Sequence, residues 1–316
     1  MNYIGIDVGG TNLAAGLVDE AGQLLATHSR SVDRSMTDTQ LAQALVQLAR
    51  DTAARAGCPE SDIAAVGVGV PGQADNNAGT VVYTPNMPFR DTSLREIFQQ
   101  SWQVPVYIGN DANCAAIGEY KAGAAQGVDS MVLITIGTGL GGGMVLDGKL
   151  FTGCAGSGME VGHMVTHPQG LLCNCGHRGC WERYASATAL VAGAVRAMEA
   201  HPDSRLSHHC EGDPARMNGR AVFAAAAEGD EAALAVLAGF REELALGLIN
   251  LVNIIEPQVI CLGGGVSNAP AELLLDPLRE LVKAGVYNPH FPTRIEKASL
   301  GNNAGIVGAA FLCETV

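Results

Sequence analysis

Short apolar runs alternate with helical patterns along this 316-residue chain. The runs end in glycine or polar loops, as buried strands do, and they cover residues 3–6, 64–70, 104–108, 131–136 and 259–262. Apolar positions at helical spacing predict helices over residues 39–56, 112–124, 231–255, 273–284 and 304–313. This alternation predicts an α/β fold with mainly parallel sheets, whose ligands bind beyond the carboxyl ends of the strands.

Residues 7–19 resemble residues 135–147. Each stretch has the pattern of a strand, a Gly/Thr turn and a second strand that ends in aspartate. The repeat predicts two related half-structures, whose turns would bring two sets of backbone N–H groups to one cleft. The alternative is that any two glycine-rich hairpins look alike.

The charge of the chain argues against nucleic acid as a partner. Lys and Arg number 19 against 32 Asp and Glu, which gives a net charge of −13, and such a surface repels phosphate backbones. No window of about 18 apolar residues is present, so no membrane span is expected. The sequence from Met1 lacks a basic signal region, and three of the nine cysteines are clustered. These features favour a reduced, cytoplasmic location over a disulfide framework.

The cysteine cluster has the spacing of a structural zinc site. Three cysteines and an upstream histidine make a closed tetrahedral set for Zn²⁺: His163, Cys173, Cys175 and Cys180. His177 is a competing ligand inside the cluster, and untethered cysteines are the alternative to a metal site. A closed zinc site holds segments in place, so we expect it to fix the loop that carries Glu160 and Glu182, and these glutamates to recognise a ligand.

Three glycine-rich turns could hold a nucleotide. Gly9 and Gly10 allow the backbone to approach an anion, Thr11 adds a hydroxyl donor, and Asp7 could hold Mg²⁺ directly or through water. The turn is neither a Walker loop nor a dinucleotide fingerprint, and a plain β-turn is the alternative. The second turn contains Gly137, Thr138 and Gly139. The third, Gly263, Gly264 and Gly265, would leave a flat slot for a base or a sugar ring, or would serve close helix–strand packing.

Asn110 and Asp111 follow a predicted strand and precede a predicted helix. Asp111 could be the helix N-cap. In a functional interpretation it is the base for a substrate hydroxyl, because phosphoryl transfer requires one carboxylate aimed at the attacking group. Asn110 would then offer a donor and an acceptor to a neighbouring hydroxyl. Gly72 and Asn86 lie in turns that also follow strand-like runs, and Asn86 could bind a polyol.

Four motifs together resemble the ROK family (repressors, open reading frames, kinases): Asp7-x-Gly-Gly-Thr11, Asn110-Asp111, Glu160-x-Gly-His163 and Cys173-x-Cys-Gly-x-x-Gly-Cys180-x-Glu182. The resemblance extends from residue 4 to about residue 308 and is strongest to bacterial ROK glucokinases. It implies the actin-like (ribonuclease-H-like) ATPase fold, with two α/β domains and an active-site cleft between them. The predicted domains are residues 1–118 with 303–316, and residues 119–302, which include the zinc knuckle.

The family resemblance also implies a reaction, in which the γ-phosphoryl of ATP is transferred to a sugar hydroxyl, usually O6 of a hexose. Asp111 matches the catalytic base, and the implied substrate-binding residues are Gly72, Asn86, Asn110, Asp111, Glu160, His163 and Glu182. The implied nucleotide-binding residues are Asp7, Gly9, Gly10, Thr11, Gly137, Thr138, Gly139, Gly264 and Gly265. His163 would bind zinc through one ring nitrogen and sugar through the other.

The resemblance leaves the sugar open. Three features depart from the glucokinase pattern: Met159, Trp181 and the run Pro88-Phe89-Arg90. Glucose is favoured, and the alternatives are kinases of N-acetylmannosamine, N-acetylglucosamine, fructose or a β-glucoside. A non-catalytic sugar-sensing repressor is a remote alternative, since Asp7 leaves no room for a preceding DNA-binding domain. The expected cofactors are ATP, Mg²⁺ and structural Zn²⁺, and the expected assembly is a homodimer.

Overall fold

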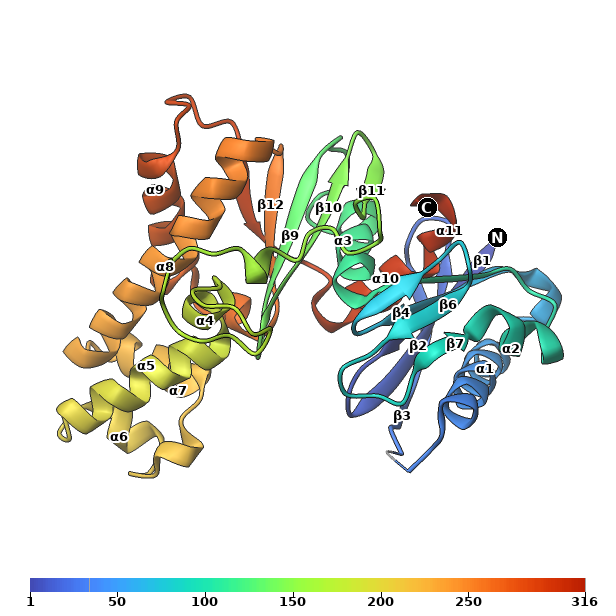
Figure 1. Cartoon of the computed structure of the whole chain (residues 1–316), viewed down its shortest axis with the longest axis horizontal. Helices are drawn as coiled ribbons and strands as arrows, with labels where there is room; N and C mark the ends of the chain where they lie inside the picture. Colours follow the sequence, from blue (N-terminus) through green and yellow to red (C-terminus); the bar gives the residue numbers. More distant parts are fainter. Residues whose placement is uncertain (34, 316) are drawn as a thin grey trace. The chain divides into compact units, whose positions relative to one another are not determined.

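The computed structural model describes residues 1–33 and 35–315, which divide into two compact units (Figure 1). The first unit comprises residues 1–133, 143–159 and 298–316, and the second comprises residues 134–142 and 160–297. The domain boundaries predicted from the sequence stay a prediction, because these units group residues by packing and not by independent folding.

The first sheet has the strand order β3-β2-β1-β4-β8. Its strands are β1 (Asn2–Val8), β2 (Asn12–Asp19), β3 (Leu24–Ser31), β4 (Ile63–Val70) and β8 (Val106–Asn110). β1, β4 and β8 are parallel, whereas β2 and β3 pair antiparallel because they follow β1 through tight hairpins. The expectation of mainly parallel pairing is therefore met for only half of this sheet. β8 begins later than predicted, at Val106, since Pro105 has no N–H for the ladder.

The second sheet has the order β11-β10-β9-β12-β13. Its strands are β9 (Met131–Ile136), β10 (Leu140–Leu146), β11 (Lys149–Phe151), β12 (Val259–Gly263) and β13 (Arg294–Lys297). The two repeated stretches thus form β1-turn-β2 and β9-turn-β10, as their pattern predicts. A small third sheet, β5 (Gln73–Asp75), β6 (Thr80–Tyr83) and β7 (Arg90–Ser93), had no clear signal in the sequence.

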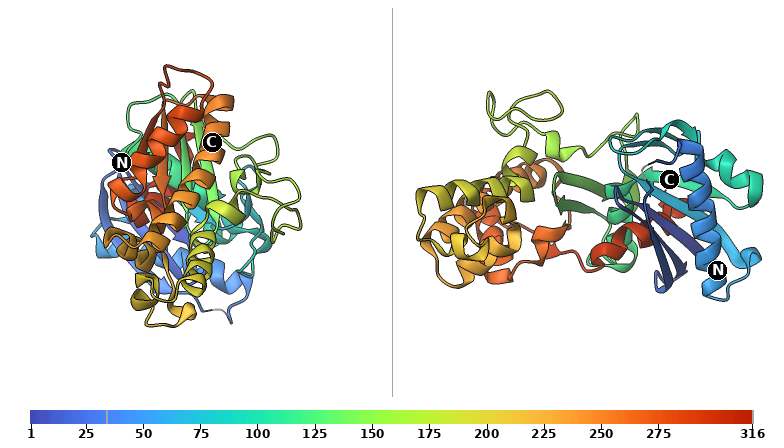
Figure 2. Two further views of the ribbon diagram at one scale, coloured as in Figure 1. Left: turned by 90° about the vertical axis from the view of Figure 1, so that its left-hand side faces the viewer. Right: turned by 90° about the horizontal axis from the view of Figure 1, so that it is seen from below.

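Eleven α-helices lie in the described ranges. They are α1 (Asp38–Arg55), α2 (Leu94–Ser101), α3 (Asp111–Ala122), α4 (Glu182–Ala185), α5 (Ala187–Ala200), α6 (Arg205–His209), α7 (Gly219–Ala227), α8 (Glu231–Ile255), α9 (Leu275–Gly285), α10 (Ala304–Ala310) and α11 (Leu312–Thr315). The predicted final helix is divided between α10 and α11. In the second unit α5, α6, α7 and α8 gather into one group, and the yellow-green loops of residues 160–181 extend from it (Figure 2).

Successive residues of β1 point to opposite faces of the first sheet, and different helices pack on the two faces. Ile4 and Ile6 are fully buried in the cluster that contains Leu41 and Leu45 of α1. Gly5 points the other way, and a Cβ on it would come 1.8 Å from the carbonyl oxygen of Ile306 in α10. Figure 1 shows α1 and α10 on opposite sides of this sheet. The sheet of the first unit is therefore closed by a helix that is encoded some 300 residues after β1.

None of the helices in the described part of the chain has both the length and the hydrophobicity needed to cross a bilayer.

Gly308→Ala is expected to destabilise the protein by about 1–3 kcal/mol, because overpacking forces the backbone to shift. A Cβ at Gly308 would lie 1.5 Å from the carbonyl oxygen of Cys114 in α3. The matched control is Gly239→Ala in α8, where no atom lies within 4 Å of the added Cβ. That change should stabilise the helix by about 1 kcal/mol. Urea unfolding of both variants measures the contrast, and equal effects of the same sign would contradict the close α3–α10 packing.

Candidate functional site

Asp111 occupies the first position of α3, at the carboxyl end of β8. The N-cap of this helix is Asn110, whose Oδ1 accepts hydrogen bonds from the N–H groups of Ala112 (2.9 Å) and Asn113 (3.2 Å). The interpretation of Asp111 as an N-cap is therefore wrong. Its carboxylate stays in the first turn, where the helix dipole favours a negative charge.

Asn110 also connects two of the predicted site residues. Its Nδ2 donates a 3.0 Å hydrogen bond to the carbonyl oxygen of Gly72. Gly72 has φ +105°, and a Cβ there would lie 2.3 Å from the carbonyl oxygen of Tyr83, so only glycine fits this turn. Asn110 was expected to bind substrate with both ends of its amide. Its oxygen is instead committed to the helix and one of its amide hydrogens to Gly72.

Asn86 lies exposed in a turn that neighbouring side chains hold rigid. The buried hydroxyl of Thr84 donates to the carbonyl oxygen of Met87 at 2.9 Å. Arg90 donates to the carbonyl oxygen of Thr84 at 2.7 Å and stacks over Tyr83, with 4.1 Å from its guanidinium carbon to the ring centroid. Arg90, one of the departures from the glucokinase pattern, thus shapes the turn that presents Asn86.

Asp7 and Asp111 influence one another within the first unit. Burial, and then the negative charge of Asp111, raise the pKa of Asp7 to about 6. Burial, and then the charges of the same two carboxylates, raise the pKa of the Cys114 thiol. The turn that follows Asp7 is closed by a 2.9 Å hydrogen bond from Gly9 N–H to Asn12 O, and Gly10 and Thr11 are exposed on it. Two close carboxylates beside an open glycine turn favour a cation or a proton at this end of the sheet.

The raised pKa of Asp7 predicts a pH-dependent stability. Between about pH 4 and pH 6 the native state holds the proton of Asp7 more tightly than the unfolded chain does. The stability that this proton contributes is present below pH 4 and is lost as the pH rises through 6, for a total of about 3 kcal/mol.

Asp7→Asn should therefore raise the urea midpoint at pH 7.5 in the absence of Mg²⁺ and leave it unchanged at pH 4. Asp62→Asn, at an exposed position, is the control. A gain that is equal at both pH values would refute the assignment.

The second glycine turn connects β9 to β10 in the second unit. Gly137 N–H donates to Gly139 O at 3.0 Å, and Leu140 N–H donates to Oε2 of Glu182 at 2.9 Å. Gly264, of the third glycine cluster, has φ +82°, and a Cβ on it would lie 2.5 Å from the carbonyl oxygen of Ile136. Two of the three glycine clusters therefore meet at the end of β9, and Glu182 lies with them.

The predicted metal ligands converge. The donor atoms of His163, Cys173, Cys175 and Cys180 all lie within 4.8 Å of one another. Sγ of Cys175 is 3.6 Å from Sγ of Cys180, and Sγ of Cys173 is 3.8 Å from Nδ1 of His163. A zinc tetrahedron has S–S edges of about 3.8 Å and S–N edges of about 3.6 Å. These four residues thus fit a tetrahedral cation, and the four-residue group does not include His177.

Trp181, which follows the predicted zinc ligand Cys180, packs against the long helix α8. Its Nε1 donates a 2.8 Å hydrogen bond to the carbonyl oxygen of Glu243, and its ring occupies the space where a Cβ of Gly247 would stand, at 2.0 Å. Nε2 of His167 lies 3.4 Å from a carboxylate oxygen of Glu243, and its ring stacks on Tyr184 with 4.1 Å between centroids. Trp181 was noticed only as a departure from the family pattern, because its partner lies 62 residues away.

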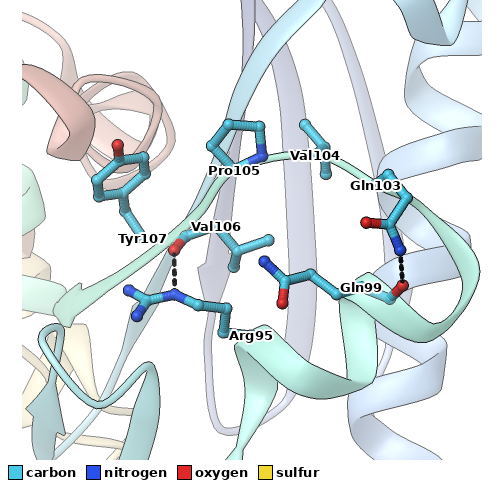
Figure 3. Close-up of a pocket in the computed structure, with 7 residues that line it drawn as sticks. All are labelled: Arg95, Gln99, Gln103, Val104, Pro105, Val106 and Tyr107. Atoms are coloured by element: carbon cyan, nitrogen blue, oxygen red, sulfur yellow. Dashed lines mark hydrogen bonds between the residues drawn. The ribbon is translucent and has the colours of Figure 1, made fainter.

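In the first unit a hollow of about 380 Å³ lies along the edge strand β8 (Figure 3). It is lined by Arg95, Gln99, Gln103, Val104, Pro105, Val106 and Tyr107. The guanidinium of Arg95 donates to the carbonyl oxygens of Val106, Asn77 and Asn76 at 3.0, 3.0 and 2.6 Å. These bonds satisfy carbonyl groups at the edge of the sheet, which gives Arg95 a structural role.

The comparisons with known proteins agree with the motifs. The model of the ROK family matches residues 3–316. A glucokinase from Streptomyces coelicolor is 38% identical over 313 residues, which are 98% of this chain and 96% of that protein. The crystal structure of a ROK family glucokinase from Streptomyces griseus, in complex with glucose and AMPPNP, superposes with a TM-score of 0.82 at 36% identity and covers 99% of both chains. A xylose repressor from Caldicellulosiruptor bescii is 31% identical over 97% of this chain and 76% of its own length.

Proposed function

Because this chain belongs to the ROK family and has its two-domain, actin-like α/β fold, we propose that it is a sugar kinase that transfers the γ-phosphoryl group of ATP to O6 of a hexose, with glucose favoured. Similarity to glucokinases over nearly the whole chain supports the reaction. The observation that carries the proposal is the similarity to glucokinases over nearly the whole chain. The charge of Asp111 raises the pKa of Asp7, which supports a place for the proposed base near the proposed phosphate turn.

In the proposed mechanism Asp111 accepts the proton of the attacking sugar hydroxyl. Asn110 fixes the start of α3 through its N-cap bonds. The backbone of Asp111 is thereby held in place, and its short side chain leaves the carboxylate little freedom to move. Gly9, Gly10, Thr11, Gly137, Thr138 and Gly139 offer backbone and hydroxyl donors to the phosphates. Mg²⁺, when bound, neutralises phosphate charge, and Asp7 is the residue that would hold it.

We further propose that Glu160, His163 and Glu182 bind the sugar, with Gly72, Asn86 and Asn110 as further contacts. Gly264 and Gly265 would border the adenosine, since the end of β9 lies against Gly264. The four clustered donors would hold Zn²⁺ as a structural ion that leaves no open position for chemistry. Cytoplasmic location and assembly as a homodimer stay predictions.

Four other sugar classes compete with glucose as the substrate. Arg90 shapes the turn that presents Asn86, and Trp181 anchors the backbone next to Glu182. Both residues depart from the glucokinase pattern. N-acetylmannosamine, N-acetylglucosamine, fructose and β-glucosides are therefore the competing substrates. The similarity to a xylose repressor keeps a non-catalytic sugar sensor as the second function.

A coupled assay of ADP release, run with each of these sugars, ATP and Mg²⁺, separates the proposals. We expect glucose to give the highest kcat/KM. A higher value with another sugar would change the substrate but keep the reaction. If every sugar leaves ADP release at the background rate, the kinase proposal fails and the sensor is favoured.

A further inference from the structure

The turn between β9 and β10 is held from one short segment of the same unit, residues 182–188. Leu140 N–H donates to Glu182, as described above. Ala187 N–H donates to the carbonyl oxygen of Gly137 at 2.9 Å. The hydroxyl of Thr188 donates to the carbonyl oxygen of Thr138 at 2.7 Å. Two successive carbonyl groups of the turn are therefore bonded to the first residues of α5.

These two bonds set the orientation of the turn's N–H groups. The described chain has no cis peptide bonds, and in a trans peptide the C=O of one residue points opposite to the N–H of the next. Because the carbonyls of Gly137 and Thr138 point towards α5, the N–H groups of Thr138 and Gly139 point away from it. Two adjacent N–H groups on one side of a turn form an anion-binding nest.

We propose that Thr188 is a positioning residue for the nucleotide. Its hydroxyl, together with Ala187 N–H, holds the β9–β10 turn so that Thr138 and Gly139 present their N–H groups to the phosphates of ATP. The inference rests on the proposed function and adds a residue that none of the sequence motifs contains. Ala187 contributes only its backbone N–H, so a substitution of Thr188 is the way to test how the turn is held.

The exposure of Thr188 distinguishes positioning from a structural role. Its side chain lies at the surface, where a single hydrogen bond adds little to folding stability. Thr188→Val removes the hydroxyl and keeps the shape, whereas Thr188→Ser keeps the hydroxyl. The matched control is Thr315→Val in α11, which removes a hydroxyl that donates to Phe311 O at 3.3 Å in the other unit.

The experiment measures the Kd of AMPPNP with Mg²⁺ by titration calorimetry, the KM values for ATP and glucose, and the Tm. We expect Thr188→Val to weaken AMPPNP binding about 3- to 10-fold and to raise the KM for ATP in parallel. The KM for glucose and the Tm should stay at their wild-type values, and Thr188→Ser and Thr315→Val should bind AMPPNP like the wild type.

Three outcomes would overturn the assignment: unchanged AMPPNP binding by Thr188→Val, an equal loss in Thr188→Ser, or a loss that follows a lowered Tm. Direct binding also separates this failure from that of the proposed function. If the wild-type protein binds no AMPPNP, the kinase proposal falls together with the role of Thr188. If the wild type and Thr188→Val bind it equally, only the role of Thr188 falls.

Discussion

Asp111→Asn is expected to lower kcat by about 10²- to 10⁴-fold, which is the contribution of a positioned general base. Asparagine has the same shape and can occupy the first turn of α3, but it cannot accept the proton of the sugar hydroxyl. Because binding of ATP and sugar does not require that proton transfer, their KM values should change less than about threefold. Steady-state kinetics and calorimetric binding of glucose measure the separation between chemistry and binding.

The control for this variant is Asp203→Asn, at an exposed position in the second unit. The variant also carries an internal check on folding. The charge of Asp111 contributes to the raised pKa of Asp7, so its removal relieves repulsion and should not lower stability above pH 6. Turnover equal to that of the wild type would remove Asp111 from the mechanism. A loss of activity that accompanies unfolding would contradict the expectation that the variant stays folded above pH 6.

Cys175→Ser is expected to lose the bound zinc and to raise the KM for the sugar by at least about 10-fold, with a lowered Tm. Cys175 is the exposed member of the set, whereas Cys173 and Cys180 are buried. Serine fits the space but is a poor zinc ligand, and the loss of one ligand opens a closed tetrahedron. The loop then loses the support that keeps Glu160 and Glu182 in place. Metal analysis, kinetics and thermal unfolding measure the three effects.

Cys154→Ser is the matched control, since Cys154 is exposed and lies outside the four-residue set. It should keep the metal, the KM and the Tm. The zinc assignment is wrong if the native protein contains no zinc. It is also wrong if Cys175→Ser retains one zinc per chain, because a closed Cys₃His site needs all four ligands.

The buried strands could be predicted because each is a short apolar run that ends at a glycine or a polar turn. β3 could not, because its residues are mostly exposed or half-buried and no run marks it. The strands β5, β6 and β7 are three or four residues long, which is too short for a periodic signal. α5 and α7 were missed since their alanine-rich sequences have apolar residues on all sides. Tertiary packing, not local pattern, selects these elements.

The candidate site also has features that local sequence predicts and features that depend on tertiary packing. Motif spacing predicted the four converging metal donors, and the raised pKa of Asp7 agrees with a carboxylate pair at the end of β1. The N-cap role of Asn110 could have been predicted, because asparagine before a helix is a preferred cap. The roles of Trp181 and Thr188 could not, because their partners lie 62 and 50 residues away in the sequence. The role of Arg95 could not, because its bond to Val106 depends on how α2 packs beside β8.

The position of α10 has a consequence for synthesis on the ribosome. β1, β2 and β4 are translated early, yet Gly5 and Gly67 lie against the backbone of a helix made about 300 and about 240 residues later, respectively. Until residues 304–310 leave the exit tunnel, the part of the sheet around Gly5 and Gly67 lacks the helix that packs on it. Folding of the first unit must therefore be completed late in translation or after it, and the surface that α10 later covers is exposed until then.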